Sequence, residues 1–353
     1  MFVLTRRRLF SLAALPAALS LAPAVCAAPR PIADEGFAPI GGIEQWIAIR
    51  GRDRSRMAIL FLHGGPCEAQ SPFLSLFAPW EERYVVAQWD QRGTGRTFGK
   101  NGTSTPNMTL EQLAQDAVEV TRYVLGRLQA RKLILVGHSW GAMLGLSVIR
   151  LRPELFHAFV GTGQPVSGRN NFEILRSSAV ARAEAAGEAQ VAAELKDLTE
   201  SDFADPRKLS TFFKWTAAPF AKPDQDFLIK RGALLGSPGK PASTAAADFF
   251  ASNPWPGDPA AHPVCLQKLL PFAIEFDARA SGYDLPVPFF VIQGRDDPRF
   301  PPEAVRAFVN QVRAPAKGFT VIEGGHFACF ANPIGFLNAL DTDIRGLGRQ
   351  VGR

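Results

Sequence analysis

The chain has 353 residues, 46% of them apolar, and a mean hydropathy of 0.00. A chain of this length and composition can bury one large core and carry a smaller inserted unit, which excludes a disordered protein. Its net charge of +6 includes three arginines in the first 28 residues, and the remaining +3 is too small and too dispersed for a nucleic-acid-binding surface, so no nucleic acid is expected as a partner.

The first 28 residues have the pattern of an export signal. Arginines at positions 6–8 precede an apolar stretch that ends in small residues at Ala27 and Ala28. Two of these arginines followed by Leu9 resemble the twin-arginine signal. The stretch is broken by prolines and is shorter than the roughly 20 residues of a spanning helix. We therefore expect cleavage of residues 1–28, no stable membrane span in the mature chain, and a periplasmic or secreted protein with a net charge of +3.

Short apolar runs bounded by turn residues predict three buried parallel strands, at residues 57–62, 84–89 and 132–136. Between the last two runs, apolar residues repeat at three to four positions over residues 109–128, which predicts a helix capped by Thr109. This alternation indicates an α/β fold, a mostly parallel sheet with helices on both faces.

Strands and helices resume near the C-terminus, at residues 287–292, 302–312, 319–322 and 333–344. The intervening stretch, 167–283, instead contains alanine-rich segments that are typical of helices, followed by loops with proline and aromatic residues. We therefore predict one interrupted core, residues 29–166 and 284–353, with residues 167–283 inserted as a helical cap.

Gly137-His138-Ser139-Trp140-Gly141 follows a predicted strand and opens a small-residue helix, residues 142–149. Glycine-x-serine-x-glycine between a strand and a helix is the nucleophile elbow of serine hydrolases. At so tight a turn, a side chain in place of either glycine would collide with the neighbouring chain. The motif predicts that Ser139 is the nucleophile.

In this architecture the acid and the base follow the serine in chain order, on loops after later strands. One such loop holds Asp296 and Asp297, and the other holds His326 after a pair of glycines. Asp297 is favoured because it lies three residues beyond Gly294 and directly before Pro298, with Asp296 as the alternative. His326 is predicted to be the base.

An acyl-transfer enzyme also needs backbone N–H groups that stabilise the oxyanion. His63-Gly64-Gly65-Pro66 follows the first predicted strand, where such a loop is expected. The predicted donors are the N–H groups of Gly65 and Trp140. His63 is expected to be a buried imidazole that supports the loop.

Five motifs together resemble the proline iminopeptidase family of α/β-hydrolases. They are His-Gly-Gly-Pro at 63–66, Asp-Gln-Arg-Gly-Thr-Gly-Arg-Thr at 90–97, Gly-His-Ser-Trp-Gly at 137–141, Gly-Arg-Asp-Asp at 294–297 and Gly-His at 325–326. The resemblance implies a cap and an aminopeptidase-like reaction on a small-molecule or short-peptide substrate, without a cofactor. No Cys/His cluster has zinc spacing, so no metal is expected.

The chain departs from the family at two places. The first loop of the family usually continues with glycine, whereas this chain has Cys67. Family members that hold a substrate ammonium typically have a cap glutamate after a tryptophan, whereas Trp215 is followed by Thr216. We therefore expect a free N-terminal ammonium to add little to catalysis. The residues predicted to line the pocket are Cys67, Trp215, Phe327 and Cys329.

Two other functions remain open: an exported esterase or lactonase with the same triad and, more remotely, a non-catalytic binding protein. A complete triad argues against the latter.

Three cysteines remain after signal cleavage. Cys67 and Cys329, which follow the oxyanion loop and the base, are expected to be neighbours, either as a disulfide or as two free thiols. Cys265 is expected to stay unpaired. No oligomeric state is predicted.

Overall fold

The structure is a computed structural model that describes residues 29–199, 202–203, 205–216, 222–234 and 261–350. The predicted export signal lies outside these residues. Within them, no helix is both long enough and apolar enough to span a bilayer.

In the part of the chain that the structure describes, eight strands form one sheet in the order β1-β2-β4-β3-β5-β6-β7-β8. The strands are β1 Ile32–Ile40, β2 Ile43–Gly51, β3 Ala58–Leu62, β4 Val85–Trp89, β5 Leu133–His138, β6 Phe156–Thr162, β7 Phe289–Gly294 and β8 Lys317–Ile322. β2 runs antiparallel to both of its neighbours, and the remaining neighbours are parallel. The α/β class and the joining of both halves of the chain in one sheet are thus confirmed.

The sequence analysis missed β1, β2 and β6. β1 lies at the edge of the sheet and is largely exposed, so it lacks the apolar run of a buried strand. β6 is otherwise buried, but the exposed His157 interrupts its apolar pattern. β6 is nevertheless central to the site, because it lies between β5 and β7.

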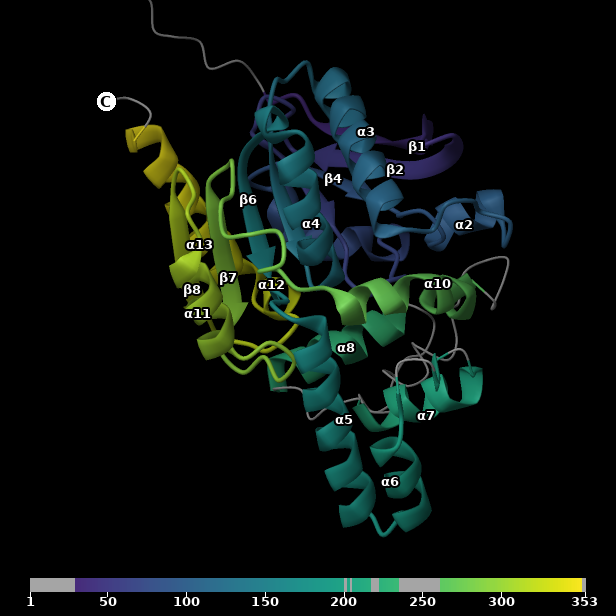
Figure 1. Cartoon of the computed structure of the whole chain (residues 1–353). Coiled ribbons are helices and arrows are strands. Elements are labelled where there is room, and N and C mark those ends of the chain that lie inside the picture. Colours follow the sequence, from purple (N-terminus) through teal and green to yellow (C-terminus); the bar gives the residue numbers. More distant parts are fainter. Residues whose placement is uncertain (1–28, 200–201, 204, 217–221, 235–260, 351–353) are drawn as a thin grey trace, which may run out of the picture.

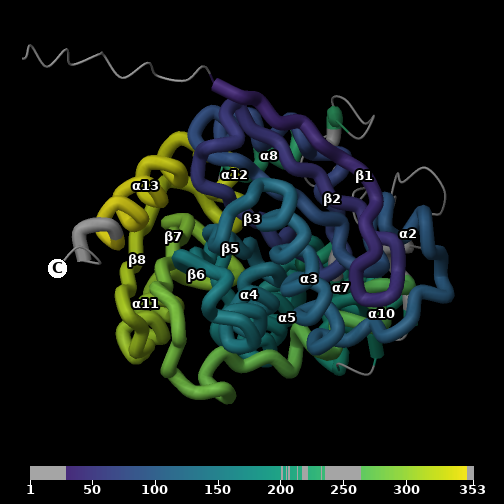
Figure 2. Tube along the Cα trace, turned by 90° about the horizontal axis from the view of Figure 1, so that it is seen from above, coloured from purple at the N-terminus to yellow at the C-terminus, as the bar shows by residue number. Residues whose placement is uncertain are grey.

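Side chains of alternate residues along a strand pack on opposite faces of the sheet. Leu60 of β3 belongs to a core cluster with α3 and α4, whereas Phe61 belongs to a second cluster with α1 and α13. Figure 2 shows α3 and α4 on one side of the sheet and α13 on the other. The helices of these layers are η1 Ser71–Phe77, α1 Ala78–Glu81, α2 Gly95–Asn101, α3 Leu110–Leu128, α4 Trp140–Leu151, η2 Pro153–Leu155, α11 Pro302–Gln311, α12 Ala328–Ala331 and α13 Pro333–Gln350.

Within the described residues, five further helices lie between β6 and β7 in the chain, and we call them the cap helices. They are α5 Gly168–Ala185, α6 Ala189–Lys196, α7 Pro206–Thr216, α8 Lys222–Leu234 and α10 Ala261–Glu275. Figure 1 shows them gathered beyond the carboxyl ends of the parallel strands. Residues 178–198, expected to be an alanine-rich helical stretch, are divided between α5 and α6, because Gly187 adopts a left-handed φ of 76° between them. The exact domain boundaries remain a prediction.

Candidate active site

Ser139 occupies the sharp turn between β5 and α4. Its φ of 54° and ψ of −117° are unusual for a residue with a side chain. A Cβ at Gly137 would lie 2.4 Å from the carbonyl oxygen of Gly141, and a Cβ at Gly141 would lie 2.0 Å from that of Leu62. Only glycine fits at these two positions, as the motif predicted.

Asp297 is buried and fixed by hydrogen bonds. His326 Nδ1 lies 3.0 Å from its Oδ2, and Gln293 Nε2 donates to the same oxygen over 2.8 Å. The backbone N–H groups of Arg299 and Phe300 donate to Oδ1. Burial by itself would raise the pKa of Asp297, but the nearby His326 and these hydrogen bonds outweigh it and lower the pKa.

The alternative acid, Asp296, lies on the surface, where its N–H donates to the carbonyl of Gly324. Of the two neighbouring carboxylates, only Asp297 is hydrogen-bonded to the His326 ring. The geometry therefore distinguishes two residues that the sequence left open.

The His326 ring is positioned by residues from β5 and from the turn after β6. A Cβ at Gly163 would lie 2.9 Å from His326 Cε1, so a glycine there leaves room for the ring. His138 Nε2 lies 2.9 Å from the carbonyl oxygen of His326. Because burial lowers the pKa of His138 to about 3, its ring is neutral and donates from Nε2.

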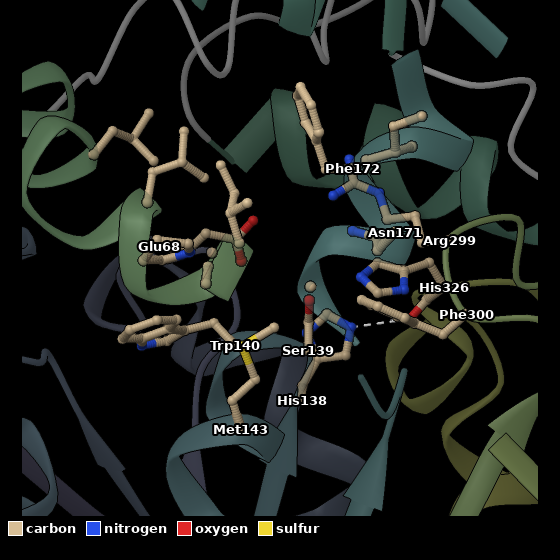
Figure 3. A pocket seen from close by; sticks show the side chains of 18 of the residues that line it. Glu68, His138, Ser139, Trp140, Met143, Asn171, Phe172, Arg299, Phe300 and His326 are labelled. Carbon is tan, nitrogen blue, oxygen red and sulfur yellow. Dashed lines mark hydrogen bonds between the residues drawn. The ribbon is translucent and has the colours of Figure 1, made fainter. Parts of the chain in front are cut away.

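Ser139 and His326 line the same cavity, and Figure 3 shows them together at its floor. None of the hydrogen bonds among the described residues joins the Ser139 hydroxyl to the His326 ring. In free enzymes the contact between nucleophile and base is often long and tightens when substrate binds.

The predicted oxyanion loop passes directly beside Ser139. A Cβ at Gly64 would lie 3.4 Å from the Cβ of Ser139, and Gly65, with a φ of 122°, lines the cavity. Trp140 is the first residue of α4, and N–H groups at a helix start have no partner within the helix. His63 is fully buried and accepts a hydrogen bond from the N–H of Gln91, as expected of a supporting residue.

The cavity above Ser139 has an accessible volume of about 90 Å³. Its walls are largely apolar, and cap helices supply Phe172, Leu175, Phe212, Leu266, Leu270 and Ile274. Apart from Ser139 and the two histidines at the floor, three polar side chains interrupt this apolar lining: Glu68, Asn171 and Arg299. Figure 3 shows Glu68 on the side of Trp140, and Asn171 and Arg299 on the side of His326. The sequence analysis named none of these three.

Only one of the four predicted pocket residues, Phe327, lines the cavity. Trp215 is half-buried on α7 and is not part of the lining. Cys329 is fully buried in the second core cluster, beneath the site. Cys67 is also buried, is not part of the lining, and forms a disulfide bond.

The disulfide joins Cys67 to Cys265 of α10, with Cα atoms 5.8 Å apart and a sequence separation of 198 residues. This corrects two expectations, that Cys265 is unpaired and that Cys67 is either bonded to Cys329 or free. α10 packs over the oxyanion loop, a proximity that residue order does not reveal. Cys329 is the free cysteine among the described residues.

Asp224 of α8 was also missed. Its side chain is fully buried and accepts hydrogen bonds from the N–H groups of Gly325 and Phe327, each over 3.1 Å. Burial raises the pKa of Asp224, and the two hydrogen bonds oppose that shift. Because these N–H groups flank His326, a cap helix fixes the backbone that carries the ring.

A second contact joins the cap to the oxyanion loop. Arg231 of α8 pairs with Glu68 over 3.4 Å, and both side chains are buried. Burial opposes ionisation of Glu68, but the Arg231 guanidinium lowers its pKa overall. The described residues contain no cluster of three or more potential metal-ligating side chains.

Comparisons with known proteins agree with this geometry. A family model described as "Alpha/beta hydrolase family" matches residues 59–340. The chain is 28% identical over 320 residues to the probable aminopeptidase YbaC of Bacillus subtilis (strain 168), covering 87% of this chain and 94% of that protein. It is 31% identical over 115 residues to the proline iminopeptidase of Lactobacillus crispatus (strain ST1), covering 32% of this chain and 37% of that protein.

Among solved structures, a proline iminopeptidase-related protein of Thermus thermophilus superposes with a TM-score of 0.59 at 20% identity, covering 90% of this chain and 98% of that one. At this identity the likeness concerns the fold. Together, the matches confirm the resemblance to proline iminopeptidases that the five motifs indicated.

Proposed function

Because the chain belongs to the alpha/beta hydrolase family, we propose that it is a serine hydrolase that cleaves an amide or ester bond through an acyl-enzyme. The observation that carries the proposal is the Ser139 elbow beside a His326 ring whose Nδ1 is bonded to the buried Asp297. This is the arrangement of a nucleophile, a base and an orienting acid.

In the proposed reaction, His326 Nε2 takes the hydroxyl proton of Ser139 as Oγ bonds to the substrate carbonyl carbon. The N–H groups of Gly65 and Trp140 stabilise the resulting oxyanion. His326 then gives the proton to the leaving amine or alcohol as the scissile bond breaks. Water attacks the acyl-enzyme by the same route, which releases the acid and restores Ser139.

An aminopeptidase-like reaction is our first choice of substrate class. It is supported by the relative named a probable aminopeptidase, which aligns along 87% of this chain. The second candidate is an esterase or lactonase, which the apolar cavity lining favours because esters need no charged recognition group. Both reactions use the same triad.

We also propose that the protein acts in the periplasm or outside the cell. The signal pattern of residues 1–28 supports this location. The disulfide between Cys67 and Cys265 supports it independently, because disulfides persist in oxidising compartments.

The proposal is tested with Ser139→Ala. We expect the variant to fold with an unchanged Tm, to lose labelling by a fluorophosphonate, and to lose roughly 10⁴-fold or more of kcat on aryl esters and aminoacyl arylamides. The substrate that the wild-type protein cleaves faster distinguishes the two candidate classes. Undiminished turnover in the variant would remove Ser139 from the mechanism.

A further inference from the structure

A second cavity adjoins the cavity at Ser139. Its walls come mainly from the start of α5, from the loop after Asp297 and from the start of α11. Its accessible volume is about 300 Å³, against about 90 Å³ for the cavity at Ser139. Asn171, Arg299 and Phe300 line both cavities, and we call them the shared residues. The second cavity therefore begins where the first one ends.

The shared residues lie on the side of the site from which the leaving group departs in the proposed reaction, on which this inference rests. The substrate carbonyl oxygen is directed toward the proposed oxyanion donors, and the leaving group toward His326, which protonates it. Figure 3 shows Asn171, Arg299 and Phe300 on the His326 side of the cavity. The centroids of the Phe300 and His326 rings are 5.6 Å apart. A long leaving group that extends beyond His326 therefore meets the shared residues.

The size of the first cavity limits how much of a substrate it holds. A water molecule needs roughly 10–15 Å³ of accessible volume, so this cavity has room for about six to nine water-sized groups. That is about the size of one small acyl group with its scissile bond. An extended residue spans about 3.5 Å, so a leaving group of about two residues reaches past the Phe300 ring. Its second residue then lies in the second cavity.

The second cavity offers apolar surface to such a group. Ile174 of α5, Pro301, and Ala304 and Val305 of α11 are part of its lining. Ile174 is one of the exposed large apolar side chains among the described residues, with 36% of its surface exposed. A bound apolar group would remove this surface from water, which is favourable.

The charged residues of the second cavity already have carboxylates beside them. Arg279 donates two hydrogen bonds to Asp277, over 2.8 Å and 2.6 Å. Burial lowers the pKa of Arg299, and the carboxylates of Asp297 and Glu68 oppose that shift. The charge of each arginine is thus offset within the protein, which favours an uncharged occupant.

We infer that the second cavity binds the far end of the leaving group. The substrate class is then an amide or ester with a long, uncharged leaving group. For an aminopeptidase-like enzyme it is a peptide of at least three residues with an apolar third residue, and for an esterase it is an ester of a long-chain alcohol. Ile174 and Ala304 are specificity-determining residues, because they contact only the part of the substrate beyond the shared residues.

The test compares two matched substrate pairs: alanyl-alaninamide with alanyl-alanyl-leucinamide, and ethyl acetate with hexyl acetate. The members of a pair share the acyl group and the kind of scissile bond and differ in the length of the leaving group. We expect the wild-type protein to favour the longer member by roughly tenfold or more in kcat/KM, because its apolar end becomes buried. Whichever pair the enzyme hydrolyses decides the matter.

Ala304→Trp fills the second cavity from α11. Ala304 is exposed, so the larger side chain meets no packed core. We expect the preference for the longer member to fall roughly tenfold, while kcat/KM for the shorter member stays within about threefold. Ile174→Trp, which narrows the cavity from α5, should lower the preference by roughly threefold or more. Thermal melts verify that both variants fold.

Ala307→Trp is the matched control, because Ala307 is exposed on the same helix but is not part of the lining. We expect it to leave the preference unchanged. The comparison between variants cancels the intrinsic reactivity of each leaving group.

Hydrolysis of both members of a pair without a preference for the longer one overturns the inference and leaves the serine mechanism standing. So does a preference that Ala304→Trp and Ile174→Trp leave unchanged, or that Ala307→Trp lowers equally. Failure of the proposed function has a different signature, since no Ser139-dependent hydrolysis of any of the four substrates is then seen. That result overturns both.

Discussion

Ser139, the proposed nucleophile, has a strained backbone conformation that its neighbours hold in place. Its positive φ is tolerated because the carbonyl of Thr162 accepts its N–H over 3.0 Å and glycines two residues away on each side make room for the turn. Such strain, held by neighbouring strands, is typical of functional positions. In this chain it directs the hydroxyl into the cavity.

Asp297 and Asp296 offer a direct test at the residue scale. Asp297→Asn replaces one carboxylate oxygen by an amide nitrogen, which cannot accept a hydrogen bond from His326 Nδ1. We therefore expect kcat to fall by roughly 10³–10⁴-fold. Asp296→Asn should stay within about twofold of wild type, because its side chain is on the surface. Steady-state kinetics on one ester substrate measures both, and losses of equal size would contradict the assignment of the acid.

At the scale of elements, cap helix α8 is attached to both sides of the site. Asp224 holds the loop that carries His326, and Arg231 holds Glu68 of the oxyanion loop. One helix therefore fixes the loops of the proposed base and of the proposed oxyanion donor relative to each other. We expect the cap helices to support the catalytic geometry as well as to cover it.

Asp224→Ala should leave the N–H groups of Gly325 and Phe327 buried without an acceptor. We expect a loss of about 2–3 kcal/mol in the free energy of unfolding and a fall in kcat with little change in KM, partly rescued in Asp224→Asn. Asp226→Ala is the control on the same helix, because Asp226 is exposed and pairs with Lys222. Its effect should stay below about 0.5 kcal/mol. Equal effects of both alanine variants in thermal unfolding and kinetics would rule out a positioning role for Asp224.

The disulfide links two elements, the oxyanion loop and α10. Alkylation of the denatured, unreduced protein should label the peptide with Cys329 but not those with Cys67 or Cys265, which become labelled only after reduction. We expect Cys265→Ser to lower the free energy of unfolding by about 2–4 kcal/mol. Mass spectrometry and denaturant titration measure these outcomes. Labelling of Cys265 without reduction would contradict the bond.

At the scale of the whole molecule, the free energy of unfolding should depend on pH through a carboxyl group on α13. Asp343 of α13 is half-buried, its Oδ2 has no hydrogen-bond partner among the residues described, and burial raises its pKa to about 6. The folded state therefore keeps this proton at pH values where the unfolded state has released it. The resulting stabilisation is complete below pH 3.8 and is lost as the pH rises through about 6.

Asp343→Asn removes the charge with little change in shape. The difference between a pKa of 3.8 and one of about 6 corresponds to about 3 kcal/mol in the free energy of unfolding. Because Asp343 is only half-buried, solvent screening reduces this contribution to about 1 kcal/mol. We expect the variant to unfold at a Tm about 2 °C above wild type at pH 8, with no advantage at pH 4. Thermal melts at the two pH values decide this, and an equal gain at both would exclude titration of Asp343 as the cause.

The sequence by itself determined the α/β class, and it predicted the elbow, the order of the proposed triad and the proposed oxyanion loop. These features are readable because each depends on a few consecutive residues, and because parallel strands bring the loops that follow them to one edge of the sheet. Gly137 and Gly141 are needed for reasons local to their own turn, and Thr109 caps α3 by accepting from the N–H of Gln112, three residues away.

Only the tertiary structure decided what surrounds that chemistry. The choice of Asp297 over Asp296 depends on which carboxylate faces His326, and the partner of Cys67 lies 198 positions away on α10. Asp224 acts on a loop about a hundred residues distant, through contacts for which its own segment has no pattern. Helix propensity and apolar spacing predict that cap helices form, but which side chains they turn toward Ser139 depends on how each helix packs on the core.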